Sequence, residues 1–222
     1  HFSTDITGTG TTVDGGCAEY CAVTASQVYK VADSLSFEQA AMTEPVSCCL
    51  HGIELCNIKC GDTVMVIGCG MIGLIMLQLA KLSGAANIIA IEPIKEKREQ
   101  ALKLGADIAL DPKADNIPET LKKQGLEQVD VVIECVGRPE TIEQAITLAG
   151  KYSTVMMFGL TKPDAEISVM PFEIFKKEIT LKSSYINPYT FPAAIKLIES
   201  GKLDVSSMIY KTEPLEELPS IL

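Results

Sequence analysis

The chain has 222 residues, a formal net charge of −10 and 47% apolar residues. This length allows one or two domains with a substantial core. The acidic balance argues against a nucleic-acid partner or an anionic membrane surface, because either would need a basic face. No apolar stretch of membrane-spanning length is free of glycine and charge. We therefore expect a soluble protein with neither a nucleic-acid partner nor a membrane partner.

The eight cysteines lie in apolar or strand-like surroundings, and no signal-peptide pattern precedes them. A reduced, cytoplasmic chain is expected. Metal binding is the alternative, but Cys48, Cys49, Cys56 and Cys60 lack the paired Cys-x-x-Cys spacing of a structural zinc site. We expect buried free thiols.

The first part of the chain, residues 1–46, has turn-forming glycines and short alternating runs, which predict a β-rich module. In this interpretation Cys17 and Cys21 lie on one face of a strand. A short helix with a serine cap is expected over 34–42, followed by a longer helix from Val46 to about Cys56.

The stretch over 62–92 carries the most specific pattern in the chain. An apolar run over 63–67 leads into Gly68-Cys-Gly70-Met-Ile-Gly73, and an apolar helix pattern follows. Gly68 permits a tight turn, Gly70 lets a pyrophosphate approach the backbone, and Gly73 lets the helix lie close to the sheet. The helix N-terminus then offers free N–H groups to the phosphates. This context predicts a dinucleotide-binding loop.

Glu92 ends the second apolar run, 19 residues after Gly73. A carboxylate at this place can accept hydrogen bonds from both hydroxyls of the adenosine ribose, and it would repel a 2′-phosphate. The pattern therefore predicts NAD rather than NADP. A glycine-rich turn in another α/β domain, such as a methyltransferase, is the alternative.

After Gly61 the pattern alternates between strands and helices. Repeated βα units predict a parallel sheet with right-handed crossovers. The expected fold class is α/β, a doubly wound six-stranded parallel Rossmann sheet with strand order 3-2-1-4-5-6. The expected strands are about 63–67, 87–91, 107–110, 129–134, 153–159 and 178–183. The expected helices are about 71–83, 94–104, 117–125 and 139–149.

The segment after Asn187 no longer alternates. It holds a helix pattern over 191–200, a strand-like run over 208–211 and a helical pattern from Pro214 onward. We expect this tail to return toward the first module. Because the chain begins without Met and stops within a helical pattern, we also expect a fragment of a longer protein.

Several short motifs accompany this order of elements: Asp14-Gly-Gly-Cys-Ala-Glu-Tyr20, Met42-Thr-Glu-Pro45, the glycine fingerprint, Leu104-Gly-Ala-Asp107, Glu134-Cys-Val-Gly137 and Met157-Phe-Gly159. With them the chain resembles the medium-chain dehydrogenase/reductase superfamily over essentially its whole length. Its Glu-Pro pair is most similar to the zinc-dependent sorbitol (L-iditol) and threonine dehydrogenase branch. The resemblance implies that residues 1–45 are the end of a GroES-like catalytic domain, 46–186 an NAD-binding Rossmann domain and 187–222 a return to the catalytic domain.

The resemblance also implies cofactor contacts at matching positions. Lys97 corresponds to a basic residue at the adenosine ribose, Ile72 to an aliphatic side chain behind the nicotinamide ring, and Cys48 to a residue beside that ring. The loop after the fourth strand is implied near the adenosine half, and the end of the fifth strand near the carboxamide. The implied cofactor-binding set is Gly68, Gly70, Met71, Ile72, Gly73, Glu92, Lys97, Val136, Gly137, Arg138, Phe158, Gly159 and Leu160.

Glu44 falls where this branch places a carboxylate at the catalytic zinc, as a ligand or just behind the zinc-bound water. In the intact parent, zinc would lower the pKa of the substrate hydroxyl and a hydride would pass to nicotinamide. The family's catalytic Cys, Gly-His-Glu segment and structural zinc lobe would lie before His1. We therefore expect this chain alone to hold no catalytic zinc and to be inactive. Alternatively, the Glu44 carboxylate caps the helix that follows, at the positive end of the helix dipole. His51 is expected to be a packed or capping side chain rather than a metal ligand.

The resemblance implies a zinc- and NAD-dependent dehydrogenase that transfers a hydride from a secondary alcohol or polyol, such as sorbitol or L-iditol, to NAD. An L-threonine 3-dehydrogenase, a zinc-free quinone reductase and a non-catalytic NAD-binding module are the alternatives. An upstream Cys followed by Gly-His-Glu would favour the zinc enzyme. The implied partners are a small-molecule substrate and further copies of the chain, in a homodimer or homotetramer.

Overall fold

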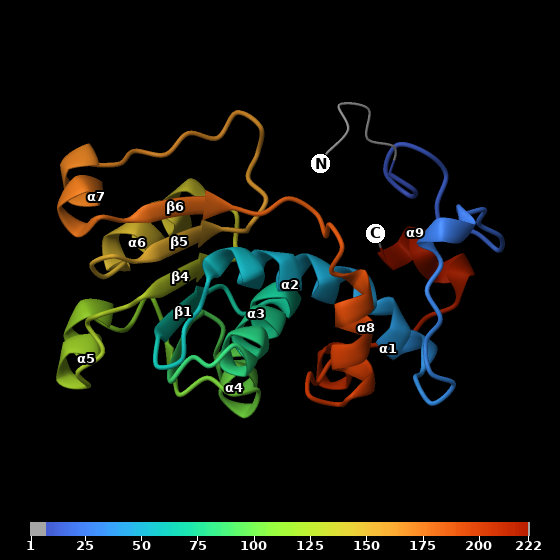
Figure 1. Ribbon diagram of the computed structural model, residues 1–222, viewed down its shortest axis with the longest axis horizontal. Coiled ribbons are helices and arrows are strands. Elements are labelled where there is room, and N and C mark those ends of the chain that lie inside the picture. Colours follow the sequence, from blue (N-terminus) through green and yellow to red (C-terminus); the bar gives the residue numbers. More distant parts are fainter. Residues whose placement is uncertain (1–7, 222) are drawn as a thin grey trace.

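A six-stranded parallel sheet forms the centre of the protein in the computed structural model, which describes residues 8–221 (Figure 1). The strand order is β3-β2-β1-β4-β5-β6, which confirms the predicted doubly wound sheet. The strands are β1 (Thr63–Ile67), β2 (Asn87–Ile91), β3 (Ile108–Leu110), β4 (Val131–Glu134), β5 (Thr154–Met157) and β6 (Thr180–Ser183).

Helices connect the strands at the places that the apolar periodicity predicts, with one addition. They are α2 (Thr43–Cys56), α3 (Met71–Leu82), α4 (Lys95–Lys103), α5 (Ile117–Lys123), α6 (Pro139–Leu148), α7 (Pro171–Lys177) and α8 (Phe191–Glu199). Helix α7 is not among the predicted helices, although Pro171 in its first turn and two lysines in its last turn are helix-terminus signals. No helix within residues 8–221 is long and apolar enough to cross a bilayer.

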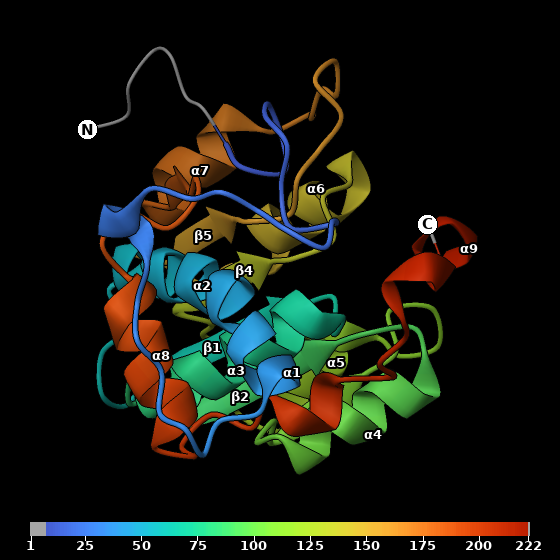
Figure 2. The same cartoon turned by 90° about the vertical axis from the view of Figure 1, so that its right-hand side faces the viewer.

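The sheet is covered on both faces, which explains its near-continuous apolar strands. Successive residues of β1 point to opposite faces: Val64 and Val66 join the cluster formed with α2, α3 and α8, whereas Met65 and Ile67 join the cluster with α5 and α6. Figure 2 shows α2, α3 and α8 together on one side of the sheet. The register pairs Ile67 with Ile91 and with Glu134. The carboxyl ends of β1, β2 and β4 therefore meet at one edge.

The predicted β-rich character of the first module is wrong for the residues that the structure describes. Residues 8–36 contain a single isolated bridge, between Thr9 and Val13, and a 3-10 helix over Ala25–Gln27. Alternating apolar residues supply a strand preference, but a strand also needs a neighbour for its backbone groups and a layer to bury one face. Residues 8–36 find neither within the described chain, and Tyr20, Val23 and Val28 are exposed.

The short helix with a serine cap is confirmed as α1 (Phe37–Ala41), where the Ser36 hydroxyl accepts a hydrogen bond from Gln39 N–H in a capping box. The tail does contact the first segment. Glu199 at the end of α8 accepts a hydrogen bond from Ala32 N–H at 2.7 Å, and the Gln39 side chain donates to Ser206 at 2.9 Å. The strand expected over 208–211 is absent there; a 3-10 helix over Ser206–Met208 precedes extended chain.

Candidate functional site

The glycine loop between β1 and α3 has the geometry that each glycine was predicted to provide. Gly68 has a positive φ of 90°, which a side chain disfavours. A Cβ on Gly73 would lie 1.8 Å from the Gly68 carbonyl oxygen, so the helix can approach the loop only without one. A Cβ on Gly70 would meet no atom within 4 Å. The loop therefore leaves open space beside Gly70, at the N-terminus of α3.

Glu92 follows β2 and is 5% exposed. One carboxylate oxygen accepts a hydrogen bond from Cys69 N–H in the glycine loop at 2.8 Å, and the other accepts one from Ile94 N–H at 3.0 Å. Each oxygen keeps a further lone pair for another donor. Glu92 thus ties the glycine loop to the end of β2 and retains the capacity to bind hydroxyl groups.

A cavity of about 610 Å³ lies beside this loop, at the edge where the ends of β1, β2 and β4 meet. A crevice at this switch in strand order is where doubly wound sheets bind ligands. Six residues of the predicted cofactor set line it: Gly68, Gly70, Glu92, Lys97, Val136 and Arg138. Cys135, Lys113, Glu140, Thr141 and Gln144 also line it and were not predicted to do so.

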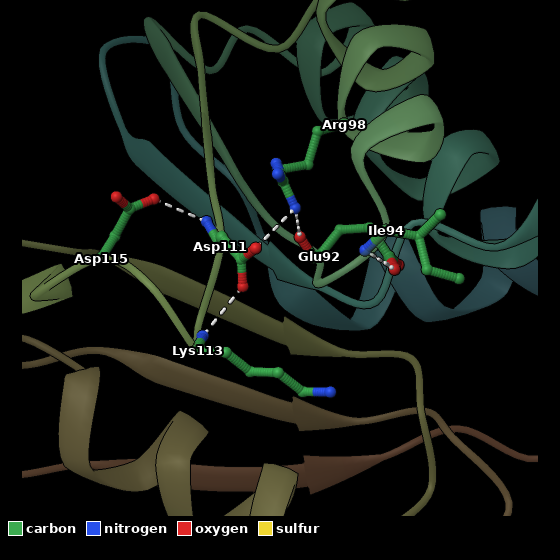
Figure 3. A network of polar contacts seen from close by, with 6 residues as sticks. All are labelled: Glu92, Ile94, Arg98, Asp111, Lys113 and Asp115. Carbon is green, nitrogen blue, oxygen red and sulfur yellow. Dashed lines mark hydrogen bonds and ion pairs between the residues drawn. The ribbon is translucent and has the colours of Figure 1, made fainter.

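A polar network fixes the rim of the cavity between β2 and β3 (Figure 3). Arg98 on α4 donates to the Glu92 carbonyl at 2.7 Å and forms an ion pair with Asp111 at 3.2 Å. Asp111 in turn accepts a hydrogen bond from Lys113 N–H at 2.9 Å and donates its own N–H to Asp115 at 2.7 Å. The loop after β3 is therefore held against the segment that carries Glu92.

Glu134 organises the loop after β4, a role that is not among the predictions from the sequence. It is fully buried, and its Oε1 atom accepts hydrogen bonds from Val136 N–H, Gly137 N–H and the Thr141 hydroxyl at 2.7 to 2.9 Å. Three donors on one oxygen fix the path of this loop beside the cavity. An acidic residue at a strand end, with a glycine three residues later, is the sequence signal that could have predicted this role.

The remaining predicted cofactor residues do not line this cavity; they are Met71, Ile72, Gly73, Gly137, Phe158, Gly159 and Leu160. Gly137 packs directly against Gly159, two residues after the end of β5. The contact is so close that a Cβ on Gly159 would lie 2.1 Å from the Gly137 nitrogen. The Phe158 ring packs against Gly52 of α2, and Leu160 is exposed. Met71 and Ile72 lie in the first turn of α3. The loops after β4 and β5 are thus in contact.

Glu44 lies in the first turn of α2, as the helix-dipole alternative requires, and is exposed. Its carboxylate accepts a hydrogen bond from the Cys48 thiol at 3.2 Å. Burial and the neighbouring Glu44 raise the pKa of that thiol to about 12, which opposes a metal-binding thiolate. Residues 8–221 contain no group of three or more His, Cys, Asp or Glu side chains placed to hold a metal. These residues do not fit a catalytic zinc, which needs three protein ligands.

The prediction that the cysteines are buried is correct for only part of the set. Cys49, Cys56 and Cys69 are buried, and Cys48 and Cys135 are intermediate. Three are exposed, namely Cys17, Cys21 and Cys60. The first two are exposed because the expected strand that would have buried them does not form in this part of the chain.

Alkylation should separate the two groups of thiols. At pH 8 iodoacetamide should label Cys17, Cys21 and Cys60 within minutes and leave Cys56 and Cys69 largely unmodified, because burial raises the pKa of both thiols to about 12. Peptide mass spectrometry of the native chain, compared with a urea-unfolded sample, measures this. Equal labelling of all sites in the native chain would contradict the packing described.

The sheet order, the glycine loop and the acid after β2 define a dinucleotide-binding fold of the dehydrogenase class. The chain belongs to the zinc-binding dehydrogenase family, which it matches over residues 72–200. It is 33% identical to D-arabinitol dehydrogenase 1 of Uromyces fabae, over 94% of this chain and 61% of that protein. It is 29% identical to sorbitol dehydrogenase of Ovis aries, over 92% of this chain and 58% of that protein. The chain therefore spans about three fifths of these relatives.

Solved structures show the same architecture. A zinc-binding dehydrogenase from Sinorhizobium meliloti bound to NADP has a TM-score of 0.90 and 36% identity, over 94% of this chain and 62% of that chain. An alcohol dehydrogenase from Escherichia coli in complex with NADH has a TM-score of 0.89 and 26% identity, over 96% of this chain and 63% of that chain. The two neighbours thus differ in the cofactor that they hold.

Proposed function

We propose that this chain is the cofactor-binding part of an NAD-dependent dehydrogenase that oxidises a secondary alcohol or polyol. The observation that carries the proposal is the cavity beside Gly70, where open backbone and the Glu92 carboxylate meet at the switch in strand order. A nicotinamide held there would supply the hydride acceptor for oxidation of the substrate carbon that bears the hydroxyl.

The residues of this chain would bind and orient the dinucleotide. The pyrophosphate would lie against Gly70 and the free N–H groups at the start of α3. The remaining lone pairs of Glu92 would accept hydrogen bonds from the adenosine ribose hydroxyls, and Lys97 lies on the same cavity wall. Among the rest of the predicted set, Ile72 would support the nicotinamide ring, and Phe158, Gly159 and Leu160 would meet its carboxamide.

The substrate class rests on the relatives named above, which act on arabinitol and sorbitol by their names. We infer a polyol or other secondary alcohol as the substrate of the whole protein. The described residues do not assemble a zinc site, so Glu44 has no partner ligands within them and no reaction step is assigned to it.

Glu92→Ala should weaken NADH binding about tenfold and raise NADPH affinity, because it removes a charged acceptor for the ribose hydroxyls and a repulsion from the 2′-phosphate. Calorimetric titration with both nucleotides measures the two effects. Glu96→Ala, an exposed carboxylate on α4, is the matched control and should change neither. Unchanged affinity of the Glu92 variant for both nucleotides would refute the ribose role.

A further inference from the structure

Three basic side chains line the cavity beside the glycine loop: Lys97, Lys113 and Arg138. Their side chains make no ion pair or hydrogen bond within residues 8–221. The acidic lining residues are Glu92 and Glu140, so the cavity wall is positive by one charge on a chain whose net charge is −10. This local excess of positive charge favours an anionic ligand.

Lys113 comes from the loop after β3, one strand away from the segment that carries Glu92 and Lys97. Its backbone is fixed, because its N–H donates to Asp111 at 2.9 Å. Figure 3 shows the Lys113 side chain extended away from Asp111, with its ammonium group outside the polar network. The loop is thus anchored while the charge stays free for a ligand.

Arg98 stabilises the position of the loop that carries Lys113. It joins the Asp111 carboxylate to the Glu92 carbonyl, and the Arg98 and Asp111 side chains are only 19% and 20% exposed. A charge-assisted pair at this level of burial holds its geometry better than an exposed one. The position of Lys113 is therefore tied to that of Glu92.

We propose that Lys113 is a cofactor-binding residue whose ammonium pairs with a phosphate group on the adenosine ribose of the dinucleotide, and that Arg98 and Asp111 are positioning residues for it. The inference rests on the proposed function, since it assumes that a dinucleotide occupies this cavity. A lysine ammonium suits the role because it is a compact point charge on a flexible stem. It would also offset the negative charge of Glu92 near the phosphates.

The test is calorimetric titration of the full chain and of Lys113→Met with NADH, 5′-AMP, 2′,5′-ADP and adenosine. The variant should bind NADH and 5′-AMP about fivefold more weakly, with unchanged affinity for adenosine, which has no phosphate. Lys113→Arg should retain most of the affinity for NADH and 5′-AMP, because it keeps the positive charge. A loss confined to 2′,5′-ADP, with NADH and 5′-AMP bound as before, would place the ammonium at a 2′-phosphate that NADH lacks and would overturn the inference.

Lys122→Met is the matched control, because Lys122 is exposed on α5, carries the same charge and does not line the cavity. Asp111→Asn should weaken 5′-AMP binding in the wild-type background but not further in Lys113→Met, since a positioning residue acts through the lysine. If the unmodified chain binds NADH and Lys113→Met binds it within twofold as well, the inference is overturned and the proposed function stands. If the unmodified, folded chain binds no NADH, both fail.

Discussion

Gly70→Val should abolish NADH binding while leaving the chain folded and about as stable as before. The backbone at Gly70 is extended, with φ −70° and ψ −174°, so a valine fits there without strain. A side chain at this position meets no protein atom within 4 Å and would fill the space assigned to the pyrophosphate. We expect a loss of roughly a hundredfold or more in affinity, equivalent to about 2.8 kcal/mol.

Titration with NADH and thermal unfolding of the same sample measure both halves of this prediction. Gly16→Val is a matched control, because a Cβ on Gly16 also meets nothing within 4 Å and Gly16 lies outside the cavity of the glycine loop. The control should bind NADH like the unmodified chain. Retained NADH affinity in Gly70→Val would show that the pyrophosphate does not lie at this loop.

Gly73→Ala should destabilise the fold, although it adds only one methyl group. That methyl would lie 1.8 Å from the Gly68 carbonyl oxygen and 2.9 Å from its carbonyl carbon, which are backbone atoms that cannot swing away. The start of α3 must therefore move off the loop, and we expect the free energy of unfolding to fall by about 2 to 3 kcal/mol. Urea denaturation measures it.

Gly70→Ala is the control for this second variant, since it adds the same methyl group three residues earlier in open space. Its free energy of unfolding should lie within about 0.5 kcal/mol of that of the unmodified chain. Equal stability of the two alanine variants would contradict the close contact between α3 and the glycine loop.

The sequence predicts the sheet well because its signals are local. Buried strands such as Thr63–Ile67 are continuous apolar runs, and each is followed by a helix pattern that needs the sheet to bury one face. Parallel pairing with right-handed crossovers then leaves few possible strand orders. The glycine loop was predictable for the same reason, since a turn, a helix N-terminus and an acid lie within one short stretch.

The parts that the sequence does not predict depend on contacts between distant residues. Strand formation in residues 8–36 depends on partner strands that the described chain does not supply there. Lys113 lines the cavity from the loop after β3, which an ion pair between Arg98 on α4 and Asp111 joins to the neighbouring segment. Glu134 gains its role from three donors that converge once the loop after β4 has folded. None of these contacts is visible as a periodic pattern.

Calorimetric titration of the unmodified chain with NADH and NADPH is the decisive test of the proposed dinucleotide site. We expect NADH to bind at a single site and NADPH to bind clearly more weakly, because the Glu92 carboxylate would accept hydrogen bonds from the ribose hydroxyls and repel a 2′-phosphate. A folded sample that binds neither nucleotide would contradict the claim that the cavity beside Gly70 is a dinucleotide site. Tighter binding of NADPH would contradict the role assigned to Glu92.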